Sequence, residues 1–153
     1  MDVCFRSAQL NDLDIIIKLL NQDHLGKTRE SISEKILHHY QTAFKQLLDS
    51  KFFDIVIMEE AITHEIFGCA QVMYLPHLSF KGSMRLQIES IRVEKKFRNK
   101  GLGKQLMRHC IALAKQNNCK IIQFTSNKSR TDAHRFYTNL GFKPTHVGYK
   151  MYL

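Results

Sequence analysis

Arg98-Asn99-Lys100-Gly101-Leu102-Gly103-Lys104 is the stretch of sequence that decides the fold. It follows a β-branched apolar segment typical of a strand, and it precedes a helical repeat of apolar residues. Two glycines permit a tight turn because they lack a Cβ atom, and the first turn of a helix presents unpaired amides to an anion. With three basic side chains nearby, the stretch predicts a pyrophosphate-binding turn. On this motif alone, an ordinary strand-to-helix turn with solvated lysines is the alternative.

Two other phosphate-binding motifs do not fit this stretch. A Walker motif needs Gly-Lys followed by Ser or Thr, but Gly103-Lys104 is followed by Gln105. A dinucleotide fingerprint needs a third glycine after the first strand of a βαβ unit, and neither condition holds. The turn therefore belongs to neither of these two motifs.

Segments on both sides of the turn predict an α+β fold. The periodicity predicts strands at 3–8, 52–58, 65–75 (with a bulge at Gly68), 85–94, 120–125 and 142–153. It predicts helices capped at Asn11 or Asp12, from Ser31 to Asp49, from Leu102 onward, and from Asp132 to Leu140, where Gly141 ends the helix. The order β-α-α-β-β-β-α-β-α-β predicts one layered domain over residues 1–153. Its mixed sheet would have six to seven strands flanked by about four helices.

Composition narrows the classes of function. The chain has 153 residues and a formal charge of +9, which favours anionic partners. We expect a cytoplasmic protein, because the N-terminus lacks a basic and then apolar leader and no apolar run could span a membrane. The four cysteines show no Cys-x-x-Cys spacing, so we expect buried thiols and no metal.

The sequence resembles the Gcn5-related N-acetyltransferase (GNAT) superfamily. A strand, Arg98-x-x-Gly101-x-Gly103 and a helix are similar to its motif A. Ala133-His134-x-Phe136-Tyr137-x-x-Leu140-Gly141-Phe142 resembles its motif B. The similarity covers nearly the whole chain and is strongest from 87 to 151. It implies an acetyl-coenzyme A (acetyl-CoA)-dependent N-acetyltransferase in which a primary amine attacks the thioester directly, without a metal.

The resemblance also implies a set of acetyl-CoA contacts. The backbone of the strand before the turn would pair with the pantetheine arm, and the Ile91 amide would polarise the thioester carbonyl. Arg130 departs from the commonest family pattern, which has Asn at this position. The implied acetyl-CoA-binding residues are Ile91, Arg92, Val93, Arg98, Asn99, Lys100, Gly101, Leu102, Gly103, Lys104, Asn127, Arg130, Ala133 and Phe136.

Two residues take catalytic roles by this resemblance. Glu89 would remove a proton from the substrate ammonium, directly or through water, because only a neutral amine attacks a thioester. A strand carboxylate that is solvated or paired with Arg85 or Arg92 is the alternative. Tyr137 would protonate or hydrogen-bond the departing thiolate, and a packed helix aromatic is the alternative there.

The acceptor is less well defined by sequence. The run from Ser126 to Tyr137 is similar to aminoalkylphosphonate N-acetyltransferases, although Ser90 stands where that subfamily has an acid. We expect a small-molecule amine: an aminoalkylphosphonate, polyamine, amino acid or aminoglycoside. A protein N-terminus or lysine is the alternative, ahead of a non-catalytic coenzyme A-binding or nucleic-acid-binding module. We expect neither membrane nor nucleic-acid partners, and a homodimer could form through the closing strand.

Overall fold

The computed structural model describes residues 2–22, 26, 30 and 33–153. The chain divides into two compact units, Met1–Gln123 and Phe124–Leu153. The first contains β1 (Val3–Ser7), η1 (Leu10–Asp12), α1 (Leu13–Leu20), α3 (Glu34–Leu48), β2 (Phe53–Glu60), β3 (Ile66–Pro76), α4 (Ser79–Gly82), β4 (Met84–Val93), η2 (Lys95–Phe97), α5 (Leu102–Gln116) and β5 (Cys119–Gln123). The second contains α6 (Thr131–Asn139). The proposed start of the second predicted helix, Ser31, lies outside the described residues. That residues 1–153 form one domain stays a prediction.

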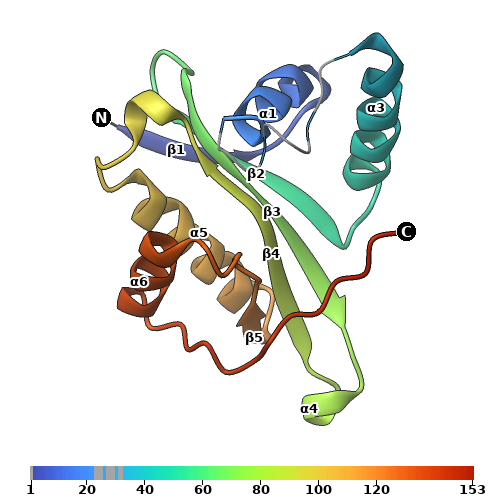
Figure 1. The fold of residues 1–153 in the computed structure, drawn as a ribbon, viewed down its shortest axis with the longest axis vertical. Helices are drawn as coiled ribbons and strands as arrows, with labels where there is room; N and C mark the ends of the chain where they lie inside the picture. The colour runs from blue at the N-terminus through green and yellow to red at the C-terminus, as the bar shows by residue number, and fades with distance from the viewer. Residues whose placement is uncertain (1, 23–25, 27–29, 31–32) are drawn as a thin grey trace. The chain divides into compact units, whose positions relative to one another are not determined.

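The sheet has the order β1-β2-β3-β4-β5 (Figure 1). The first four strands are antiparallel, and β5 joins β4 in parallel. The predicted mixed α+β fold is therefore confirmed. The prediction of six to seven strands was too high, because the sheet described here has five.

The closing strand predicted at residues 142–153 is wrong for the described structure, which assigns no strand there. Val147, Tyr149, Met151 and Leu153 alternate as in a strand, yet each is at least 63% exposed. Alternation records a local preference, whereas a strand also needs a neighbour for its backbone hydrogen bonds. The alternation of apolar residues therefore did not indicate whether a neighbouring strand would be present.

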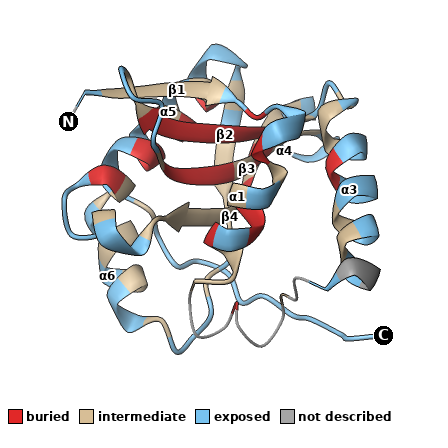
Figure 2. Ribbon diagram, turned by 90° about the horizontal axis from the view of Figure 1, so that it is seen from above, coloured by how far each residue is buried: buried red, intermediate tan, exposed pale blue. Residues whose placement is uncertain are grey.

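Helices cover both faces of the sheet in the first unit. Figure 1 shows α1 and α3 on one face and α5 on the other. The α1/α3 side is packed with Ala8, Ile16, Leu19, Phe44, Ile55, Ile57 and Cys69. The buried stripe of α5 comprises Leu102, Leu106, Met107, Cys110 and Ala114. The buried residues of β2 and β3 form the centre of this layered arrangement (Figure 2).

A buried charge cluster joins β1, η1 and β2. Arg6 donates two hydrogen bonds to Asp12, at 2.7 and 2.9 Å, and its Nε donates to Glu59 at 2.8 Å. Burial opposes ionisation of both carboxyls, but hydrogen bonds from Arg6, joined by the Gln9 amide at Asp12 and by His64 at Glu59, outweigh it. The pKa of each carboxyl is therefore lowered. The cluster fixes the start of α1 against the sheet edge.

A β-bulge interrupts β4. Cys69 pairs with Arg92 and Gln71 pairs with Glu89, so Ser90 and Ile91 together face one residue of β3. Ser90 has a φ of 53°, in the left-handed region that non-glycine residues seldom adopt. A bulge of this kind bends its strand and interrupts the ladder of backbone hydrogen bonds locally.

Gly68 lets β3 approach β4 just beyond the bulge. A Cβ atom at this position would lie 2.3 Å from the Arg92 carbonyl oxygen and 3.2 Å from Val93 Cα. Both neighbours are backbone, so they could not move without shifting a strand. The bulge predicted at Gly68 is close to the one observed between β2 and β3, where Phe67 is the extra residue.

We expect Gly68→Ala to lower the free energy of unfolding by about 1–3 kcal/mol, the usual cost of overpacking. Urea unfolding followed by circular dichroism would measure it. Gly148→Ala is the matched control, because its Cβ would make an ordinary 3.4 Å contact with Thr125. Equal stability of the two variants would contradict the close approach.

Candidate functional site

The second half of β4 has an open edge. β5 pairs only with Met84 to Gln87, and the described structure gives the rest of β4 no strand neighbour on that side. The Glu94 amide donates to Phe67 of β3 at 2.8 Å, so the preceding residue, Val93, directs its main-chain groups toward the open edge. The Val93 carbonyl instead accepts from Arg98 Nε at 3.0 Å. The Val93 amide also faces this edge, where no partner for it is described.

The Ile91 carbonyl is also held by a side chain. Arg92 Nη1 donates to it at 2.9 Å. Ile91 and Val93, the two residues predicted from sequence to supply backbone contacts, thus both have carbonyls bonded to guanidinium groups. A ligand at this edge would therefore meet two cations beside the strand.

The predicted turn is present between β4 and α5. Gly101 has a φ of 79° and Asn99 a φ of 61°, and α5 begins at Leu102 with no side-chain cap. The amides of Lys104 and Gln105 both bond back to the Gly101 carbonyl, whereas no such bond is described for Leu102 or Gly103. An uncapped N-terminus of a 15-residue helix favours a bound anion.

Basic and apolar side chains support this turn. Leu102 is 2% exposed and anchors the start of α5 in the core. Lys100 Nζ lies 5.5 Å from the centre of the Phe97 ring, and Phe97 packs edge-on against Phe67 at 4.6 Å. Arg98, Lys100 and Lys104 are exposed around the turn. The predicted residues from Arg98 to Lys104 therefore form one electropositive turn.

Gln22 connects the end of α1 to the segment leading into the turn. Its Nε2 donates to Glu94 at 2.7 Å, and its Oε1 accepts from the Lys95 amide at 3.0 Å. Sequence reasoning missed this contact because Gln22 and Lys95 are 73 residues apart. No motif marks such a pair.

If the turn binds the pyrophosphate expected from sequence, Gly101→Ala should weaken acetyl-CoA binding about tenfold. An alanine leaves the left-handed region in the free protein, and restoring the turn on binding costs about 1–2 kcal/mol. Calorimetric titration would give the dissociation constant. Gly82→Ala is the control, because Gly82 has a similar φ of 69° and likewise open space, but it lies in α4. Equal weakening by both variants would contradict a role for the turn.

Glu89 lies half-buried on β4, directly before the bulge. Its Oε1 accepts from Gln87 Nε2 at 2.8 Å, and Gln87 Oε1 accepts from Gln123 Nε2 at 2.7 Å. No ion pair with Arg85 or Arg92 is described for it, although both arginines lie on the same strand. Neither glutamine was identified from sequence, because isolated glutamines carry no motif.

The second unit contains the other predicted catalytic residue, Tyr137. Its ring packs against Phe124 at 4.4 Å, Phe136 at 5.1 Å and Phe142 at 6.5 Å between centroids. This aromatic packing fits the alternative of a packed helix residue and equally holds the ring in one position. Ala133 and Phe136 lie on the same helix, α6.

The loop before α6 is held by Asn127. Its Oδ1 accepts from the Ser129 amide at 2.9 Å, and its carbonyl contacts His134 Nε2 at 2.9 Å. The Arg130 amide also bonds to the Asn127 carbonyl at 3.0 Å, directly before α6 begins. The Asn127 side chain is therefore engaged within its own loop.

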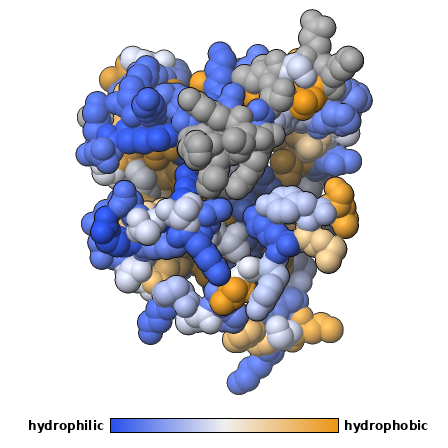
Figure 3. All heavy atoms as spheres, viewed as in Figure 1, coloured by the Kyte–Doolittle hydropathy of each residue, from blue (hydrophilic) through white to orange (hydrophobic). Residues whose placement is uncertain are grey.

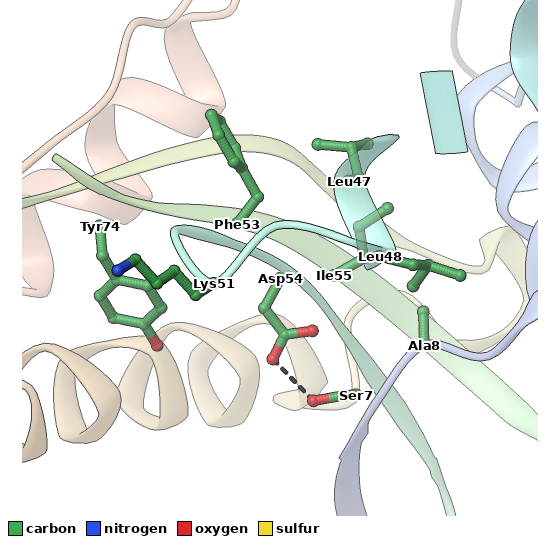
Figure 4. A pocket seen from close by; sticks show the side chains of 9 residues that line it. All are labelled: Ser7, Ala8, Leu47, Leu48, Lys51, Phe53, Asp54, Ile55 and Tyr74. Carbon is green, nitrogen blue, oxygen red and sulfur yellow. Dashed lines mark hydrogen bonds between the residues drawn. The ribbon is translucent and has the colours of Figure 1, made fainter. Parts of the chain in front are cut away.

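A pocket of about 330 Å³ lies elsewhere in the first unit (Figure 4). Ser7 Oγ donates to Asp54 at 2.7 Å on one side, and Leu47 and Leu48 of α3 lie on another. Tyr74 lines it, six residues along β3 from Gly68, or roughly 20 Å at strand spacing. It therefore lies at the end of the sheet away from the turn.

Figure 3 shows one face of the molecule as mainly hydrophilic, with hydrophobic groups in small patches.

Comparison with known proteins identifies the family. The profile of the Acetyltransferase (GNAT) family matches residues 16–142. The chain belongs to the GNAT family. None of the curated proteins compared matches it.

Solved structures share the GNAT fold. A transcriptional regulator from Bacillus halodurans C-125 is 37% identical, with a TM-score of 0.93 and 99% of each chain covered. Glucosamine-6-phosphate N-acetyltransferase from Arabidopsis thaliana is 19% identical, with a TM-score of 0.79 and 99% of each chain covered. A predicted acetyltransferase with acetyl-CoA from Clostridium acetobutylicum is 18% identical, with a TM-score of 0.74, covering 98% of this chain and 96% of the other.

The GNAT family assignment supports acetyl transfer as the general activity. Within the described ranges no group of three potential metal ligands comes together, and no helix is both long and apolar enough to cross a bilayer. All four cysteines are free thiols; Cys69 and Cys110 are buried, and Cys4 and Cys119 are only half-buried.

Proposed function

We propose that this GNAT protein transfers an acetyl group from acetyl-CoA to a primary amine, which attacks directly. The observation that carries the proposal is the segment from β4 to α5. There a bulged strand with an open edge leads into a left-handed glycine and an uncapped helix N-terminus. These are the groups that an extended arm and a pyrophosphate require.

The donor set fits coenzyme A. The amides of Ile91 and Val93 suit the amide groups of the pantetheine arm, and the start of α5 suits the pyrophosphate. Arg98, Lys100 and Lys104 supply positive charge for the phosphates. When bound, acetyl-CoA supplies the acetyl group as an activated thioester.

The protein's own side chains and main chain would carry out the proton transfer and position the reacting groups. Glu89 takes the proton from the substrate ammonium, because an amine with a pKa near 10 is mostly protonated at neutral pH. The Ile91 amide orients the acyl carbonyl as a hydrogen-bond donor. Tyr137 donates a hydrogen bond to the departing thiolate, which is a fair leaving group at a pKa of about 8.5. Holding both reactants together supplies much of the acceleration.

We propose a small amine as acceptor, with aminoalkylphosphonates first among the candidates. The similarity of residues 126–137 to that subfamily and the +9 charge both support an anionic amine. Polyamines, amino acids and aminoglycosides are the other small candidates. Protein N-termini and lysines are the alternative class.

Two measurements test the proposal. Calorimetric titration should detect acetyl-CoA binding with a dissociation constant of about a micromolar, roughly −8 kcal/mol. A thiol-release assay should then show turnover with at least one amine from a panel of aminomethylphosphonate, polyamines, amino acids, aminoglycosides and peptides. Absence of acetyl-CoA binding would overturn the proposal. Binding without turnover on any amine would favour a non-catalytic coenzyme A-binding domain.

A nucleic-acid-binding role is the second candidate. The 37% identical relative is described as a transcriptional regulator, and this chain has a formal charge of +9. Tight DNA binding that weakens steeply with salt would favour this role. Weak binding of that kind, alongside acetyl-CoA turnover, would leave the enzyme proposal in place.

A further inference from the structure

A chain of two side-chain amides leads to Glu89 from the point where β4 and β5 separate. Gln87 and Gln123 are Cα partners and form the last pair between the two strands. Gln123 Nε2 donates to Gln87 Oε1 at 2.7 Å, and Gln87 Nε2 donates to Glu89 Oε1 at 2.8 Å. Gln87 and Glu89 are two residues apart on β4, so they share one face of the sheet.

The donor and acceptor of each hydrogen bond in this series are set by the chemistry of the side chains. An ionised carboxylate only accepts hydrogen bonds, so Gln87 must turn its NH₂ group toward Glu89. Its oxygen then faces Gln123, which must present its own NH₂ group. Rotating either amide by half a turn would bring two acceptors or two donors together. The three side chains therefore have one consistent arrangement while Glu89 is ionised.

The arrangement makes the two oxygens of Glu89 different. Oε1 is occupied by Gln87, whereas no partner for Oε2 is described. All three side chains are half-buried, where amide hydrogen bonds hold their geometry better than at an exposed site. The bulge follows at Ser90, so Glu89 is the last regularly paired residue of β4 before it.

We propose that Gln87 is a positioning residue that holds Oε1 of Glu89 and presents Oε2 to the acceptor amine, and that Gln123 fixes the orientation of Gln87. This inference rests on the proposed function, in which Glu89 is the proton acceptor. No covalent step is involved; the proton passes from the ammonium to Oε2, and Gln87 keeps its hydrogen bond to Oε1.

The test is a double-mutant cycle measured by thiol release. Gln87→Met keeps the length of the side chain and removes its hydrogen bonds. We expect kcat for the best amine to fall about tenfold, in line with the loss of a hydrogen bond to a charged group, with the dissociation constant of acetyl-CoA unchanged. Gln123→Met should cost about threefold, because it removes only the outer link. Adding Gln87→Met to Glu89→Gln should cost nothing further, because Gln87 acts through the carboxylate.

Gln116→Met is the control for the substitution itself, because Gln116 is exposed near the end of α5. It should retain wild-type kcat. If Gln87→Met does not fold, the milder Gln123→Met decides the question in the same cycle with Glu89→Gln.

The outcomes separate this inference from the proposed function. A wild-type protein without turnover overturns both. An active wild-type protein with unchanged kcat in Gln87→Met overturns the positioning role alone. A loss of activity in Gln87→Met that persists at full size in the Glu89→Gln background also overturns it, because the role would then be structural.

Discussion

Glu89→Gln is expected to lower kcat/KM for the acceptor amine by about 10²- to 10³-fold near pH 7, the usual contribution of a general base. The substitution keeps the size of the side chain and removes its capacity to take a proton. Acetyl-CoA affinity should be retained, because the turn at Gly101 and the open edge of β4 do not involve this carboxylate. Thiol release with the best amine from the panel measures the rate.

The pH dependence provides a sharper check on the same variant. The defect should shrink as the pH approaches the pKa of the free amine, near 10, because the amine then loses its proton to solvent. Asp49→Asn is the control, since it removes one exposed carboxylate at the end of α3 and should leave the rate unchanged. A Glu89→Gln enzyme with wild-type kcat/KM at pH 7 would remove Glu89 from the mechanism.

Arg6→Met is expected to lower the free energy of unfolding by about 3–5 kcal/mol at pH 7, because it leaves two buried carboxylates without their partner. The side chains of Asp12 and Glu59 are 5% and 4% exposed. For a protein of this size the change corresponds to a fall in Tm of roughly 10 °C. Urea unfolding and thermal denaturation would both measure it.

The sign of the pH dependence follows from the lowered pKa of both carboxyls. Their stabilisation is fully present above the ordinary values of 3.8 for Asp12 and 4.5 for Glu59, and it is lost as the pH falls further through the folded-state values. Wild-type stability should therefore fall below about pH 4.5 as these groups titrate. The gap between wild type and Arg6→Met should narrow over the same range.

Arg135→Met is the matched control for this prediction. Arg135 pairs with Asp132 on α6, but both side chains are at least 78% exposed, so the change should stay within about 0.5 kcal/mol. A loss as large as that of Arg6→Met would mean that the arginine stem, rather than the buried pairing, accounts for the effect.

Local patterns predicted much of this fold. The turn at Gly101, the apolar stripe of α5 and the strand before them were all readable, because periodicity and glycine placement act over a few residues. The open edge at Ile91 and Val93 was expected only through the family resemblance. The structure adds a bulge at Ser90 within this stretch, which bends the strand.

Contacts between distant residues could not be predicted in this way. Arg6 and Glu59 are 53 residues apart, and Gln87 and Gln123 are 36 apart. Each pair depends on strand register, which no single segment specifies. The prediction of a closing strand was wrong for a related reason, because alternation at residues 142–153 does not provide a neighbouring strand.

The bulge at Ser90 adds a residue to β4 that the pairing of the sheet does not require. Because Cys69 pairs with Arg92 and Gln71 with Glu89, a chain lacking Ser90 could place Ile91 opposite Ala70 and keep every other pairing and every side chain on its present face. Such a chain would also lose a residue held at a φ of 53°. Folding alone therefore gives no reason to keep this residue. The straightened strand would lose its bend. Under the proposed function, the extra residue in β4 therefore serves the ligand and not the stability of the sheet.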